Sequence, residues 1–161
     1  MSWSSSDFIK LNALHFLLSC VSMGCMTDVS WEQHLETLID YCSMKNVTVV
    51  FKRGSNDRYE PDENVIYLNS QRTKENQIYL LLHELGHHQV LQDRILSEKF
   101  EPILSGPKWN LSHQVLQLEE EVMAWYFGEK TARILDITLG KKYQLLKSKC
   151  LKTYIRHLRA V

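Results

Sequence analysis

The chain has 161 residues, of which 44% are hydrophobic and 24% charged, a composition typical of an ordinary globular protein. This length is enough to bury a hydrophobic core, and it predicts one domain over 1–161. Lys and Arg number 19, as do Asp and Glu, so the formal net charge is zero, and no overall field recruits nucleic acid or an acidic surface. The chain has four cysteines without paired CxxC spacing, Cys20, Cys25, Cys42 and Cys150. A domain of this size does not need a disulfide framework, so we expect reduced thiols and a cytoplasmic protein.

The N-terminal stretch is fairly apolar between residues 8 and 26 (FIKLNALHFLLSCVSMGCM). Lys10, Asn12 and His15 interrupt it, and no basic cluster precedes it. A membrane span needs a longer uninterrupted apolar run. We therefore expect an amphipathic helical extension over about 1–27 and no membrane partner, with a poor signal peptide as the alternative.

The next segment has the pattern of a helix followed by short strands. Ser30 and Gln33 form a capping box for a helix over 31–44, with an inner face of Leu35, Leu38, Ile39 and Cys42. The β-branched run 47–52 and the run 65–69 predict two strands, and Tyr59 is placed in a further short strand between them.

The second half of the chain is predicted to be helical. A long helix is expected over 74–92, an irregular connection or short helical turns over 96–112, and a helix over 113–135 capped by Ser112. The apolar face of the helix 113–135 is expected to comprise Val115, Leu118, Val122, Trp125 and Tyr126. The last helix, 141–159, is amphipathic and basic, and we expect its basic face to be solvated rather than to bind nucleic acid.

These elements predict an α+β fold, mainly helical, with a small sheet of two or three strands near the helix 74–92. That helix carries the motif HELGHH at residues 83–88. His83 and His87 stand one helical turn apart on the same face and can share one metal ion. Glu84 points about 100° away around the axis, so it is expected to reach a water on that ion rather than the ion itself. This is the arrangement of a zinc hydrolase, in which the metal acidifies water and the glutamate takes the proton.

A catalytic zinc takes three protein ligands and keeps one position for water. The candidates for the third are Glu119, Glu120 and Glu121 on the downstream helix. Because Glu120 and Glu121 point about 100° apart, one of them should face solvent. The residues alone leave open which one binds, and a solvated acidic helix start is the alternative interpretation.

Between about residues 47 and 130 the sequence resembles the ImmA/IrrE family of zinc-dependent peptidases. The similarity is carried by NVIYLN, LLLHELGHH and EEEVMAWYFG. The family motif E-x-E-A-N-x-F-A matches this chain at Glu121, Ala124 and Phe127. The resemblance implies a zincin-like fold, Zn²⁺ held by His83, His87 and Glu121, and a protein or peptide substrate, including regulatory proteins such as repressors.

Two departures from that motif bear on activity. Trp125 stands where the family usually has Asn or Asp, and Gly128 replaces the common Ala. The loss of the polar residue favours a second hypothesis, in which a non-catalytic protein-binding module keeps the zincin fold and a structural zinc.

Three other residues near the motif have open interpretations. Gly86 inside the helix indicates either a close approach of two backbones or simple tolerance. His88 is expected at the surface or supporting the ligands rather than binding metal. His113, near the start of the helix that carries the glutamates, is expected at the surface, with stabilisation of an oxyanion as the alternative.

Overall fold

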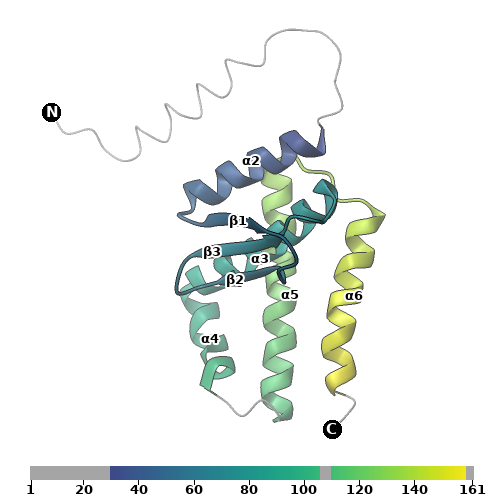
Figure 1. Cartoon of the computed structure of the whole chain (residues 1–161). Helices are drawn as coiled ribbons and strands as arrows, with labels where there is room; N and C mark the ends of the chain where they lie inside the picture. Colours follow the sequence, from purple (N-terminus) through teal and green to yellow (C-terminus); the bar gives the residue numbers. More distant parts are fainter. Residues whose placement is uncertain (1–29, 106–109, 159–161) are drawn as a thin grey trace, which may run out of the picture.

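The computed structural model describes residues 30–105 and 110–158. This part of the chain is α+β, with five helices and one three-stranded sheet (Figure 1), as the sequence predicts. The expected N-terminal helical extension, together with Cys20 and Cys25, lies outside the described residues.

The first helix, α2, spans Trp31–Met44 and leads into the sheet. The predicted capping box is confirmed, because the Ser30 side chain accepts from the Gln33 backbone N–H while the Gln33 side chain accepts from the Ser30 N–H. Asn46, with φ of 60°, turns the chain after the helix.

The sheet consists of β1 (Thr48–Lys52), β2 (Arg58–Glu60) and β3 (Val65–Asn69) in the order β1-β3-β2. β1 pairs with β3 in parallel, with Thr48 opposite Val65, and β2 pairs with β3 antiparallel, with Tyr59 opposite Ile66. The predicted strand at Tyr59 is therefore present, and it forms one edge of the sheet.

The helix α3 (Lys74–Gln92) is the centre of the molecule. Thr73 caps it by accepting from the Asn76 backbone N–H, and it packs against α2, β3, α4 and α5. Most of its residues between Gln77 and His88 are buried, so the HELGHH motif is held by packing on several sides.

The sequence predicted an irregular connection or short helical turns over 96–112, whereas the structure has one continuous helix up to Ser105. Helix α4 spans Arg94–Ser105 with Pro102 inside it. Asp93 caps it, because its Oδ1 accepts from the backbone N–H groups of Ile95 and Leu96. A proline disfavours a helix interior, so Pro102 conceals this helix in the sequence pattern.

Helix α5 (Leu111–Ile134) begins with Asn110 as its cap rather than Ser112. The predicted apolar face is also wrong, because Val115, Val122 and Tyr126 are exposed while Trp125 is fully buried. The buried face consists mainly of polar and small residues, namely His113, Glu121, Ala124, Trp125, Gly128, Thr131 and Ala132.

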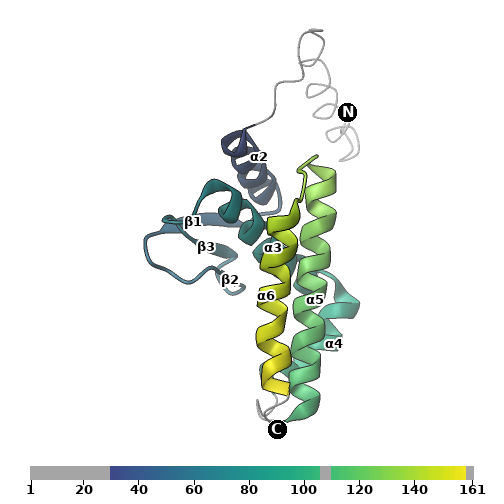
Figure 2. The same ribbon diagram turned by 90° about the vertical axis from the view of Figure 1, so that its right-hand side faces the viewer.

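Helix α6 (Lys141–Leu158) runs back along α5, and the two lie side by side in both views (Figures 1 and 2). Lys147 of α6 donates to Glu129 of α5 at 2.7 Å, and Lys142 donates to Glu75 at the start of α3 at 2.8 Å. No helix within 30–105 and 110–158 has the length and apolarity that a bilayer crossing requires.

Candidate metal centre

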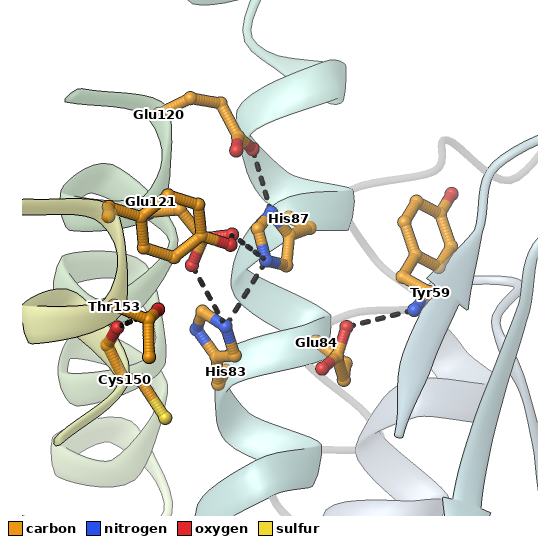
Figure 3. A network of polar contacts seen from close by, with 9 residues as sticks. Tyr59, His83, Glu84, His87, Glu120, Glu121, Cys150 and Thr153 are labelled. Atoms are coloured by element: carbon orange, nitrogen blue, oxygen red, sulfur yellow. Dashed lines mark hydrogen bonds and ion pairs between the residues drawn. The ribbon is translucent and has the colours of Figure 1, made fainter. Parts of the chain in front are cut away.

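Two imidazoles from α3 and one carboxylate from α5 converge at the middle of the molecule (Figure 3). The Nε2 atoms of His83 and His87 are 3.2 Å apart. Glu121 Oε2 lies 3.3 Å from His83 Nε2, and Glu121 Oε1 lies 3.8 Å from His87 Nε2. One ligand atom from each of these three residues lies within 4.8 Å of the others.

Two glycines allow α3 and α5 to approach closely enough to form this cluster. A Cβ on Gly86 would lie 1.9 Å from the carbonyl oxygen of Ala124, and a Cβ on Gly128 would lie 2.7 Å from that of Leu82. Neither position accepts a side chain without moving backbone. Of the two interpretations of Gly86, the close backbone approach is therefore the correct one. A second contact, with the Leu82 carbonyl, explains why Gly128 stands where an alanine would clash.

The donor set and its spacing suit a zinc ion. Tetrahedral zinc with bonds of about 2.0–2.1 Å to nitrogen and oxygen has ligand atoms about 3.3 Å apart. Two of the three separations, 3.2 Å between His83 and His87 and 3.3 Å between His83 and Glu121, agree with that edge length. The third, 3.8 Å between His87 and Glu121, is about 0.5 Å longer. Two imidazoles and one carboxylate are also a ligand combination of catalytic zinc sites.

The neighbouring carboxylate, Glu120, supports His87 from the other side of the ring. Glu120 Oε1 lies 2.7 Å from His87 Nδ1, so the expectation that one of the two glutamates faces solvent is wrong. Burial acts to lower the pKa of His87, but the hydrogen bond and charge of Glu120, with the charges of Glu84 and Glu121, raise it to about 9. Without a metal, His87 therefore carries a proton at neutral pH.

The pKa of the Glu121 carboxyl is lowered, whereas that of His87 is raised. Burial acts to raise its pKa, but the hydrogen bond with His83 and the charges of His87 and His83 outweigh this and hold the pKa below the ordinary value. The carboxylate is therefore ionised at neutral pH, the state that binds a cation.

Glu84 is buried beside the cluster and turns toward the sheet edge (Figure 3). Its Oε2 accepts from the backbone N–H of Tyr59 in β2 at 2.8 Å. Burial raises the pKa of Glu84, while the charges of His87 and His83 act to lower it. A carboxylate with a raised pKa is a better proton acceptor than an ordinary glutamate.

His88 is buried rather than at the surface, and its polar contact is with Tyr59 instead of a metal ligand. Its Nδ1 is 2.9 Å from the hydroxyl of Tyr59, and the rings of Tyr59 and His88 meet edge to face. This contact ties β2 to α3 at the point where Tyr59 holds Glu84.

His83 is contacted by an aromatic ring, whereas His87 is contacted by the carboxylate of Glu120. Its ring stacks on the indole of Trp125, with centroids 4.1 Å apart and planes tilted by 16°. His83 Nδ1 is buried and has no hydrogen-bond partner among the described residues.

The cluster opens on a cleft of about 640 Å³ whose walls come from α3, α4, α5, α6 and the β2 edge. Its lining includes His83, Glu84, His87 and Glu121, and also Cys150, Thr153 and Tyr154 of α6. The Tyr154 hydroxyl donates to Glu121 Oε1. Tyr154 was not among the predicted site residues, because no local sequence pattern connects it with a glutamate on another helix.

Two further residues lie away from the cluster. Glu119 is exposed and pairs with Lys99 of α4 at 2.8 Å, so it is not brought to the cluster. His113 is buried rather than at the surface, and it does not line the cleft.

Comparison of the chain with protein-family models, with curated proteins and with solved structures found no match.

Proposed function

We propose that this chain is a zinc-dependent metallopeptidase of the ImmA/IrrE type. The observation that carries the proposal is the convergence of His83, His87 and Glu121 with zinc-like spacing on an open cleft that also contains the Glu84 carboxylate. The family assignment rests on the motifs of the sequence, because the comparisons found no relative.

Each polar residue of the cleft has a distinct task in this proposal. His83, His87 and Glu121 hold Zn²⁺, which when bound lowers the pKa of a water ligand and polarises a carbonyl oxygen. Glu84 accepts the proton of the attacking water and delivers it to the leaving amine. The Tyr59 N–H fixes Glu84 Oε2, which leaves Oε1 to take the proton.

Two residues keep the ligands in position. Glu120 accepts from His87 Nδ1 and so presents Nε2 to the ion. Tyr154 donates to one oxygen of Glu121, which orients the carboxylate while the other oxygen faces His83. The substrate class expected from the resemblance, a protein or peptide, fits a cleft bordered by a sheet edge.

The test is cleavage of a mixed peptide library, read by mass spectrometry, by the zinc-loaded chain and two variants. Glu84→Gln is expected to keep zinc and to lose cleavage. Glu119→Gln changes a glutamate of the same helix region that lies outside the cleft, and it is expected to cleave as the wild type does. Cleavage by Glu84→Gln at the wild-type rate would show that the assigned base is wrong.

The second candidate is a non-catalytic protein-binding module in which zinc holds α3 and α5 together. The observation that favours it is the contact of His83 with the apolar face of Trp125. A structural zinc usually has four protein ligands, whereas the described residues bring together three. In this case zinc removal would lower the melting temperature sharply, and partner binding would follow the folded fraction without proteolysis.

A further inference from the structure

The ligand His83 is held in a way that differs from His87. His87 has a carboxylate at its Nδ1, the usual means by which proteins orient a metal-binding imidazole. The Nδ1 of His83 is buried without a hydrogen-bond partner among the described residues. When Nε2 binds a metal, something other than a hydrogen bond at Nδ1 must therefore set the orientation of the His83 ring.

The indole of Trp125 lies against that ring. The two planes are tilted by only 16° with centroids 4.1 Å apart, so the contact is a face-to-face stack. Trp125 is one helical turn beyond Glu121 on α5, which means that one face of one helix supplies both a ligand and the wall behind a second ligand. The close contact of Gly86 with Ala124, the residue before Trp125, brings the two helices near enough for the stack to form.

Other aromatic side chains hold Trp125 in place on the side away from His83. It is fully buried, and its ring meets Tyr143 of α6 edge to face at 5.5 Å. Tyr143 meets Tyr79 of α3 at 5.3 Å in the same manner, and Tyr79 meets Trp31 of α2 at 5.9 Å. The stack on His83 thus ends a series of aromatic contacts that involves four helices, and the indole has little freedom to turn away.

We propose, on the basis of the zinc site proposed above, that Trp125 is the positioning residue of His83. The indole face fixes the plane of the imidazole whose Nε2 points at Glu121 and His87. An imidazole bound to a divalent cation loses electron density from its ring, and an indole face is electron-rich, so the stack becomes more favourable when the metal binds. Trp125 therefore raises metal affinity, although it stands where a hydrogen-bonding side chain is expected.

The test measures zinc affinity by competition with a chelator in the Glu84→Gln background, which removes any dependence on cleavage. Trp125→Phe keeps a smaller aromatic face, and Trp125→Leu keeps bulk without one. We expect affinity to fall roughly 3-fold with Phe and roughly 10- to 30-fold with Leu, since a desolvated cation–π contact with indole is the stronger one. Tyr126→Leu removes an exposed aromatic ring of α5 that lies outside this aromatic series and is expected to leave zinc affinity unchanged.

A second measurement remains decisive if Trp125→Leu does not fold. Zinc titration of the wild type should change tryptophan fluorescence, because the bound ion withdraws electron density from the ring that contacts Trp125. Trp125→Phe should lose that change while still binding zinc. The proposal is overturned if zinc affinity is the same in wild type, Phe and Leu variants, or if fluorescence responds equally in wild type and Trp125→Phe. A chain with the expected affinity order but no peptidase activity would contradict the proposed function alone.

Discussion

Replacing Gly86 with alanine should damage both the packing of α3 on α5 and the metal site. The added Cβ would lie 1.9 Å from the Ala124 carbonyl oxygen, 2.7 Å from its carbon and 2.9 Å from its Cα. Ordinary contact begins at 3.4 Å, so the helices must separate by about 1.5 Å, because the obstructing atoms are backbone.

Two opposing terms set the cost of this substitution. Overpacking typically lowers the free energy of unfolding by about 1–3 kcal/mol or more. The higher helix propensity of alanine raises it by about 1 kcal/mol relative to glycine. We therefore expect a net loss of roughly 2 kcal/mol in the free energy of unfolding. The same separation would move Glu121 away from His83, whose atoms Oε2 and Nε2 are now 3.3 Å apart.

A zinc site tolerates errors of about 0.2 Å in its bonds. Zinc affinity should therefore fall by more than about 100-fold, beyond the loss that accompanies removal of an outer hydrogen-bond partner.

The assay combines urea unfolding of the metal-free chain with zinc competition against a chelator. Gly140→Ala is the matched control, because a Cβ there has no atom within 4 Å, and it should change stability by less than about 0.5 kcal/mol. A Gly86→Ala variant with wild-type stability and wild-type zinc affinity would refute the close contact of α3 and α5.

Three further predictions concern the charges and hydroxyls around the ligands. Zinc must displace the proton of His87, so zinc affinity should rise about tenfold per pH unit from pH 7 until the pKa of about 9; chelator competition across that range would contradict this if the affinity were constant. The folded-state pKa of His87 is raised from 6.5, so the stabilisation that its proton contributes is complete below pH 6.5 and is lost as pH rises through about 9. Urea unfolding of the metal-free chain should accordingly show stability falling between pH 7 and 10, and Glu120→Gln should reduce both pH effects. Tyr154→Phe should lower zinc affinity roughly 10-fold by releasing one oxygen of Glu121, and an unchanged affinity would assign Tyr154 to packing alone.

The elements with strong local signals were predictable from the sequence. Ser30 with Gln33 predicted the start of α2, and the run 65–69 and the helix 74–92 coincide with β3 and α3 as observed. These signals are local, because a cap or an apolar period acts within a few residues.

Helix α5 shows why periodicity failed elsewhere. Its buried face must accommodate a ligand carboxylate and two close backbone contacts, so it contains Glu121, Ala124 and Gly128 instead of large apolar residues. The apolar residues Val122 and Tyr126 lie on the exposed side. A prediction that assigns apolar residues to the buried face therefore selects the wrong face of a helix whose buried side carries functional residues.

The site itself was predictable only in part. The spacing of His83, Glu84 and His87 is a property of one helix, whereas the roles of Glu120 and Tyr154 depend on how α5 and α6 lie against α3. The stack of Trp125 on His83 is likewise a tertiary contact, and the sequence showed only that a polar residue was missing there.

The central claim is that His83, His87 and Glu121 bind one zinc ion. Elemental analysis of the purified chain after zinc loading and removal of excess metal tests it most directly, with Glu121→Ala and Glu120→Ala measured alongside. The account predicts one zinc per chain in the wild type, none retained in Glu121→Ala, and partial retention in Glu120→Ala. A wild-type chain without zinc, or a Glu121→Ala chain that retains as much zinc as the wild type, would contradict it.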